Sequence, residues 1–338
     1  MTNELKQLFQ SSLAWQQAGK QTVLATVVHL EGSSYRRPGV RMAISESGET
    51  VGAISGGCVE KEIIRQAQTV IRTGKSRIMT YDGRFRVGCD GIIYILLEPV
   101  MLSEDLWRDF DAVLKKRQVF RTESYFYIKT GEFESVGSRL IFPDTSYSLN
   151  PGFQPDQSKN QECFEQSFPP LFQLYIFGAE HDAVKLCKAA HNLGWEVSIV
   201  ASPDEAKSVE FFPGAERLIT PAFDSIDTSV LDEHTAVVLM SHSFHKDVQY
   251  LIALKDVRPA YFGLLGPGQR RERLLAEFMN YCPDPSLEFL EQLRGPAGIN
   301  IGAESPSEVA VSILAEILSV QRNQKPIALR EKTGSIHG

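Results

Sequence analysis

The sequence of 338 residues lacks the basic excess that nucleic-acid-binding proteins usually carry. It holds 35 Lys and Arg against 42 Asp and Glu, a formal net charge of -7, so we expect no nucleic-acid partner. It also lacks an apolar run near the roughly 18 residues of a membrane span, and its first residues lack an apolar core of signal-peptide length. We therefore expect a cytoplasmic protein with no membrane partner.

Cysteines are few, and no two of them form a C-x-x-C pair. Their odd number and wide spacing argue against a disulfide framework and against a structural zinc site. The five are Cys58, Cys89, Cys163, Cys187 and Cys282. Whatever these thiols do, they act singly or from different parts of the fold. The 43% hydrophobic content is enough to fill two cores, which the length also predicts.

The chain changes character near its middle. Residues 1–145 mix short strands with a few helices, which predicts an α+β domain, and the Ser-, Asn-, Gln- and Pro-rich residues 146–170 predict a linker. In 171–325 apolar strands alternate with helical patterns, which predicts a Rossmann-like, doubly wound parallel sheet. Residues 326–338 are expected to be a tail. The fold class is thus α/β, with an α+β domain preceding the Rossmann-like one.

A Gly56-Gly57-Cys58 turn precedes an amphipathic helical pattern. Backbone amides of the turn and the free N–H groups of a helix start favour an anion, and the same field favours the thiolate of Cys58. Such a thiolate can ligate a soft metal or attack sulfur or carbon. A buried cysteine packed behind a Gly-Gly turn is the alternative.

Two further loops of this half carry candidate ligand groups. In the first, hydroxyls and guanidiniums suited to phosphate lie together, at Ser33, Ser34, Arg36 and Arg37, although a solvated basic turn would have the same composition. The second loop offers Cys89 beside Gly88 and Gly91, as a second thiol or as a packed loop cysteine.

In the second half, Gly178-Ala179-Glu180-His181 occupies the strand-to-helix turn where a dinucleotide fold holds phosphate. Glu180 stands where the second glycine of G-x-G-x-x-G/A belongs, and its carboxylate would repel a pyrophosphate. Only Asp204 is available as a ribose-binding acid, beyond the usual strand end. Tight NAD binding is therefore disfavoured, while another phosphorylated ligand over Gly178 remains compatible.

Histidines follow the fourth strand of this half, at His242 and His245, with Asp247 close by. They suit metal ligation or proton transfer, or else they cap the next helix. The Gly263-Leu264-Leu265-Gly266 turn, followed by Arg270 and Arg271, suits phosphate or a sharp turn. The last helix is signalled by a capping box of Ser305 and Glu308, with Pro306 at its first position.

Taken together, these segments resemble the xanthine dehydrogenase accessory factor family, XdhC/CoxI, over most of the chain. The resemblance rests on five motifs in order: Gly32 to Gly39, Gly56 to Glu60, Phe177 to His181 with Ser241-His242, Gly263 to Gly266, and Gly298 to Glu308. It implies a molybdenum cofactor chaperone, without catalysis of its own, that protects the cofactor during sulfuration and delivers it to xanthine dehydrogenase or a related molybdenum hydroxylase.

The resemblance also implies the site residues. Cys58 would contact the metal, and the cofactor, as molybdopterin or its dinucleotide form, would be held as cargo by Ser33, Ser34, Arg36, Arg37, Gly56, Gly57, Cys58, Glu60, Cys89, Gly178, Ala179, His181 and His242. A cysteine desulfurase is a further candidate partner, and a homodimer is compatible with the sequence. An NAD(P)-dependent oxidoreductase built on the C-terminal domain, and a pure interaction module, are the alternative functions.

Overall fold

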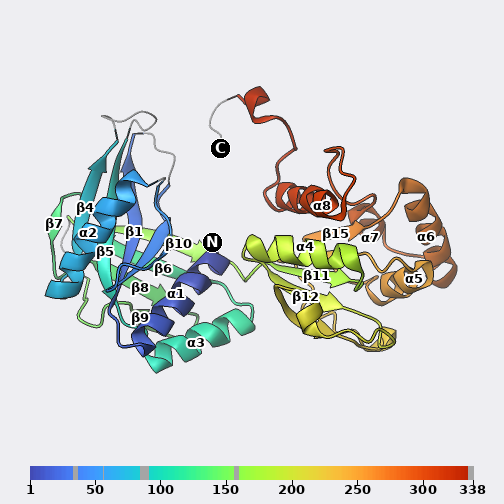
Figure 1. The fold of residues 1–338 in the computed structure, drawn as a ribbon, viewed down its shortest axis with the longest axis horizontal. Coiled ribbons are helices and arrows are strands. Elements are labelled where there is room, and N and C mark those ends of the chain that lie inside the picture. The colour runs from blue at the N-terminus through green and yellow to red at the C-terminus, as the bar shows by residue number, and fades with distance from the viewer. Residues whose placement is uncertain (33–36, 56, 84–90, 156–159, 334–338) are drawn as a thin grey trace. The chain divides into compact units, whose positions relative to one another are not determined.

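The computed structural model describes residues 1–32, 37–55, 57–83, 91–155 and 160–333. The chain divides into two compact units, Met1–Pro170 (unit 1) and Leu171–Gly338 (unit 2), each described here by itself (Figure 1). Within the segment expected to be a linker, Ser146–Ser148 (β9) and Glu162–Phe168 (β10) are strands that pair inside unit 1. Much of 146–170 is therefore part of the folded unit and not a connector.

Unit 1 contains an antiparallel sheet, sheet A, in the order β3-β2-β1-β5-β4-β7. Its strands are Thr22–Glu31 (β1), Arg41–Ser45 (β2), Thr50–Gly52 (β3), Arg77–Asp82 (β4), Ile92–Val100 (β5) and Gly131–Glu132 (β7). A second antiparallel sheet, sheet B, has the order β10-β6-β8-β9 and adds Phe120–Phe126 (β6) and Gly137–Ile141 (β8). The predicted hairpin is thus β2 and β3.

Alternating side chains of sheet A face two different layers of unit 1. Val23, Ala25 and Val27 of β1 pack with one stripe of Cys58–Thr73 (α2), whose buried residues Ile63 and Ala67 recur at helical spacing. The opposite face packs toward sheet B through Val28, Ile78, Tyr94, Leu96, Phe126 and Val136. Two other helices, Thr2–Gln17 (α1) and Glu104–Lys115 (α3), meet through an edge-to-face contact of Phe9 with Phe110.

Unit 2 is built on a parallel sheet, sheet C, in the order β13-β12-β11-β14-β15-β16. Its strands are Gln173–Phe177 (β11), Glu196–Val200 (β12), Ala215–Ile219 (β13), Thr235–Leu239 (β14), Tyr261–Leu264 (β15) and Leu293–Arg294 (β16). Numbered within the unit, this is 3-2-1-4-5-6, the dinucleotide-binding order, so the Rossmann-like prediction is confirmed. The order reverses between β11 and β14.

Helices cover both faces of sheet C. His181–Asn192 (α4) and Pro306–Gln321 (α8) pack on one face. On the other face lie Phe244–Ala253 (α5), Gly268–Tyr281 (α6) and Leu287–Gln292 (α7). Short 3-10 helices occur at Val209–Phe211 (η1), Phe223–Ser225 (η2) and Leu329–Glu331 (η3). Apolar strands buried on both faces explain the near-continuous hydrophobic runs of this half.

The start of α8 confirms the predicted capping box. The Ser305 hydroxyl accepts from Glu308 N–H at 3.4 Å, the Glu308 carboxylate accepts from Ser305 N–H at 2.9 Å, and Pro306 opens the helix. In the part of the chain that the structure describes, no helix has both the length and the apolar character that crossing a membrane requires.

Candidate functional site

The strand ends that flank three predicted ligand segments of unit 1 lie at one end of sheet A. The C-terminal residue of β1, Glu31, pairs with Ile92 at the start of β5, and so does Asp82 at the end of β4. Thr26 of β1 pairs with Arg41 at the start of β2, and Met42 pairs with Gly52 at the end of β3. The connections that carry the arginines, Cys58 and Cys89 therefore all leave the sheet at this end.

Several predicted residues of this end lie outside the described part of the chain. They are Ser33, Ser34, Arg36, Gly56 and Cys89. The neighbouring Arg37 is described and exposed. The loop that holds it is anchored where it rejoins the sheet, since Gly39 N–H donates to the Val27 carbonyl at 2.8 Å and Val27 N–H donates to the Val40 carbonyl at 3.0 Å.

Cys58 is the first residue of α2, as the sequence predicts, and Gly57 is its N-cap. Gly57 has a φ of +116°, which disfavours any residue with a Cβ, although an added Cβ would meet nothing within 4 Å. Conformation, and not crowding, thus requires glycine there. The chain presents the Cys58 backbone at a helix start reached through a left-handed turn.

Glu60 holds this turn together from inside the helix. Its carboxylate accepts hydrogen bonds from the Ser55 hydroxyl and the Gly57 N–H at 2.8 Å each, and from the Ser55 N–H. Partial burial raises the pKa of Glu60, but the hydrogen bonds from Ser55 and Gly57 outweigh it and leave the pKa below its usual value. A carboxylate of the chain therefore occupies donors that the sequence assigned to a bound anion.

We expect Glu60→Ala to loosen the turn that presents Cys58. Three hydrogen bonds to a carboxylate are lost, so unfolding free energy should fall by roughly 1–3 kcal/mol, with faster hydrogen exchange at the Ser55 and Gly57 amides. Glu62→Ala is the matched control, because the Glu62 carboxylate contacts Arg65 and Gln66 on the helix surface. Unchanged exchange at the two amides in Glu60→Ala would contradict this role.

The second group of predicted residues lies at the carboxyl ends of β11, β12 and β14 in unit 2, where doubly wound sheets bind ligands. Gly178, directly after β11, has a φ of +136°. A Cβ built there would come within 2.4 Å of the Met240 carbonyl oxygen and 2.8 Å of Ser241 Cα. The loops after β11 and β14 therefore cross backbone against backbone at the point where strand order reverses, and only glycine permits this.

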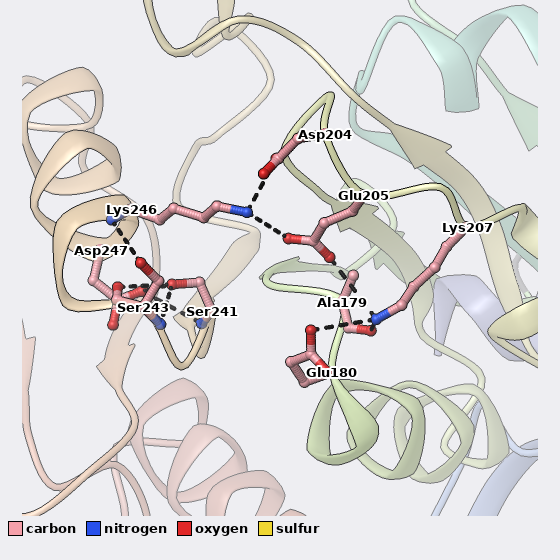
Figure 2. Close-up of polar contacts among 9 residues, drawn as sticks. All are labelled: Ala179, Glu180, Asp204, Glu205, Lys207, Ser241, Ser243, Lys246 and Asp247. Atoms are coloured by element: carbon pink, nitrogen blue, oxygen red, sulfur yellow. Dashed lines mark hydrogen bonds and ion pairs between the residues drawn. The ribbon is translucent and has the colours of Figure 1, made fainter.

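Beyond Gly178 the chain turns into α4. Ala179 is buried, Glu180 is the N-cap but makes no capping hydrogen bond with its side chain, and His181 is exposed. Lys207, from the loop after β12, reaches this turn: its Nζ donates to the Ala179 carbonyl and to Glu180 Oε1 at 3.4 Å (Figure 2). The Glu180 carboxylate, expected to repel a phosphate, is thus paired with a cation.

His242 lies across the reversal point from α4. It has a φ of +57°, an uncommon conformation for a residue with a side chain, and its Nε2 lies 2.8 Å from Asp182 Oδ2. The pair joins the loop after β14 to the first turn of α4, and His242 remains half-exposed. A carboxylate-oriented imidazole can hold an anionic group or move a proton.

The other predicted residues of the β14 loop serve structure. Asp247 is buried, and its carboxylate accepts from the Ser241 hydroxyl at 2.5 Å and from Arg270 Nη2 at 2.8 Å. Ser243 caps α5 by accepting from Lys246 N–H at 3.4 Å. The capping alternative thus accounts for this segment, and Arg270 joins α6 to α5. Among the described residues, no group of three or more His, Cys, Asp or Glu side chains could hold a metal ion.

Lysines and acids that the sequence left unassigned complete this edge. Lys246 Nζ lies 3.1 Å from both Asp204 Oδ1 and Glu205 Oε1 (Figure 2). Burial lowers the pKa of Lys246, but hydrogen bonds to Glu205 and Asp204 outweigh burial, so the pKa lies above its usual value. Asp182, Glu205, Lys207 and Lys246 were missed because sequence cannot show which loop side chains turn inward; the polar run after β12 was the available signal.

Comparison with known proteins covers both units. The model of a family described as the XdhC Rossmann domain matches residues 174–317, and that of the XdhC and CoxI family matches residues 15–82. The chain belongs to the XdhC/CoxI family. The predicted family is therefore confirmed, and the matched ranges include the Cys58 turn in unit 1 and the β11, β12 and β14 loops in unit 2.

Relatives match this XdhC/CoxI chain across both of its units. A Bacillus subtilis (strain 168) protein named as a probable xanthine dehydrogenase component is 29% identical over 325 residues, 90% of this chain and 94% of its own. The molybdenum cofactor insertion chaperone PaoD of Escherichia coli (strain K12) is 25% identical over 330 residues, 96% of this chain and 91% of its own. A crystal structure described as a xanthine dehydrogenase from Bacillus halodurans has a TM-score of 0.74 at 27% identity, covering 95% of this chain and 96% of its own.

Proposed function

We propose that this protein binds molybdenum cofactor and delivers it to xanthine dehydrogenase or a related molybdenum hydroxylase. The observation that carries the proposal is the convergence of three segments at one end of sheet A, which combines a cysteine at a helix start with an arginine-bearing loop. Likeness to a molybdenum cofactor insertion chaperone over 96% of the chain supports it. Carriage of a cargo, and not turnover of a substrate, is the activity proposed.

The chemistry of the cargo suits these residue types. Molybdenum cofactor is a phosphorylated pterin that carries a soft metal centre, so it offers an anionic end and a thiophilic end. Guanidinium groups bind phosphate through paired hydrogen bonds, and a thiolate at a helix start is a soft ligand. In the proposal, Arg37 and its neighbours in the loop hold the phosphate and Cys58 contacts or guards the metal.

Finer parts of the proposal concern the state of the cargo and the setting. We propose that the cofactor is protected here during sulfuration of its metal, with a cysteine desulfurase as the sulfur-supplying partner, in the cytoplasm. Glu60 serves as a positioning residue, because it contacts the turn through three hydrogen bonds. A loosened turn would let Cys58 sample positions away from the metal.

The test is the molybdenum and pterin content of the full chain after incubation with cofactor-containing extract. We expect about one molybdenum and one pterin per chain, and Cys58→Ala should lower retained molybdenum about tenfold, as for loss of a metal-site contact. Cys163→Ala is the matched control, since Cys163 lies in the same unit and burial with nearby Glu123 and Glu165 raises the pKa of its thiol to about 11.

Two results would contradict the proposal. Pterin and molybdenum at background level at saturating cofactor would exclude cargo binding. Equal molybdenum retention, and equal activation of a client molybdenum hydroxylase, by Cys58→Ala and the unmodified chain would exclude the role of Cys58.

A further inference from the structure

The carboxyl edge of sheet C holds a mixed-charge cluster around Glu205 (Figure 2). The Glu205 side chain is only 15% exposed, and the Lys207 and Lys246 side chains are 22% and 21% exposed. Lysines and glutamates are seldom this buried unless they are paired. The cluster therefore has a built geometry and is not a set of freely solvated charges.

One atom of this cluster is incompletely satisfied. Glu205 Oε1 accepts from Lys246 at 3.1 Å, whereas Glu205 Oε2 is buried and has no hydrogen-bond partner among the described residues, with Lys207 Nζ 3.9 Å away. A buried carboxylate oxygen without a hydrogen bond is costly. A donor supplied by a ligand, such as a hydroxyl group, would satisfy it.

The position of Glu205 matches that of a ribose-binding acid. In the strand order of sheet C, the acid that accepts the ribose 2′-hydroxyl follows the second strand, which here is β12. A turn in which Glu205 N–H donates to the Ser202 carbonyl at 2.9 Å folds the chain back after β12. Glu205 is therefore the inward-turned acid, whereas Asp204, the acid that the sequence favoured, is 70% exposed.

The charges of the cluster select the kind of ligand. Lys207 pairs with Glu180 beside the α4 start, which removes much of the repulsion that Glu180 alone would exert on a pyrophosphate. Around Glu205, however, the two lysines are already matched by Glu180, Asp204 and Glu205. A neutral hydroxyl suits this setting, and a second phosphate on the ribose does not.

We propose that unit 2 binds a nucleoside diphosphate group through its ribose hydroxyls at Glu205, with a preference for an unphosphorylated 2′-hydroxyl. This site goes beyond the proposed cargo function, because carriage of a pterin by unit 1 does not require it. The nucleoside diphosphate group can come from a free nucleotide or from a dinucleotide, and the base distinguishes the sources.

The experiment is calorimetric titration of the cargo-free full chain with ADP and CDP and with their 2′-deoxy counterparts. We expect at least one ribonucleotide to bind about tenfold more tightly than its 2′-deoxy form, since a site built to hydrogen-bond a hydroxyl rejects the analogue without it. Glu205→Gln should reduce that preference to about threefold or less while the melting temperature stays close to the unmodified value. Weaker binding of 2′,5′-ADP than of ADP would support the charge argument.

Glu210→Gln is the matched control, because Glu210 lies exposed on the same segment and should leave the preference unchanged. The proposal is overturned if neither ribonucleotide binds below about 1 mM, which corresponds to about -4 kcal/mol. It is also overturned if ribo and deoxy forms bind equally, or if Glu205→Gln keeps the full preference. None of these outcomes depends on molybdenum or pterin content, so they do not bear on the proposed function.

Discussion

Gly178→Ala should abolish stable folding of unit 2. The added Cβ would lie 2.4 Å from the Met240 carbonyl oxygen and 2.5 Å from its carbonyl carbon, and both are backbone atoms that cannot rotate away. The φ of +136° adds strain for any residue with a side chain. We expect unfolding free energy to fall by about 4 kcal/mol or more, because the two crossing loops belong to the central strands of sheet C.

Urea unfolding of the full chain and limited proteolysis of unit 2 measure this effect. Gly268→Ala is the control within the same unit, since Gly268 opens α6 and an added Cβ would meet nothing within 4 Å. Alanine there should change stability by about 1 kcal/mol or less, in the stabilising direction. If Gly178→Ala were as stable as Gly268→Ala, the backbone crossing would not be a requirement of the fold.

Stability of unit 1 should fall as pH rises from about 5 to about 8, because of Glu98. Glu98 lies on β5 between the two sheets and is fully buried, and burial raises its pKa from 4.5 to about 7. A Ser138 N–H donates to Glu98 Oε2 at 2.7 Å and lowers the pKa, as does the charge of Arg41, but both are too weak to offset burial. Oε1 has no hydrogen-bond partner in the described chain.

The sign follows from the direction of the shift. A folded-state pKa above the unfolded value means that the folded unit binds the proton more tightly, so the stabilisation is complete below pH 4.5 and is lost as pH passes through about 7. The shift corresponds to about 3 kcal/mol. Arg41, also buried, has its pKa lowered by burial to about 10 and remains charged over this range.

Glu98→Gln should remove this dependence. Urea unfolding of both chains at pH 5, 6, 7 and 8 gives a difference in unfolding free energy, in which other titrating groups cancel, and the difference should move by about 3 kcal/mol in favour of the variant. Glu134→Gln, an exposed carboxylate of the same unit, should follow the unmodified chain at every pH. A pH-independent difference between Glu98→Gln and the unmodified chain would show that Glu98 does not titrate in this range.

Local signals predicted elements where the sequence pattern and the structural period agree. The capping box of α8 and the apolar stripe of α2 are such cases, because caps and amphipathic spacing act within a few residues. The strands β10 and β13 were missed for the opposite reason. Both lie at the edge of their sheets and leave many of their residues exposed, so they carry no apolar alternation.

The candidate sites divide in the same way. Glycine motifs located the Cys58 turn and the Gly178 turn, since left-handed backbone leaves a mark in the sequence at the residue itself. The partners of those turns did not: Glu60 fills the first turn from within, and Lys207 reaches the second from 27 residues away along the chain. Which charges meet depends on loop direction, which neighbouring residues do not encode.

The sequence by itself determined the fold class of each half, the family and the turns at which ligands are expected, because turn chemistry, caps and strand–helix alternation are local properties. Only the tertiary structure decided what those turns contact. It brought three connections of unit 1 to one end of sheet A through strand register, and it placed Glu205 between two lysines beside the Gly178 turn. Register and the path of a loop are long-range outcomes of how a whole sheet packs, so no short stretch of sequence contains them.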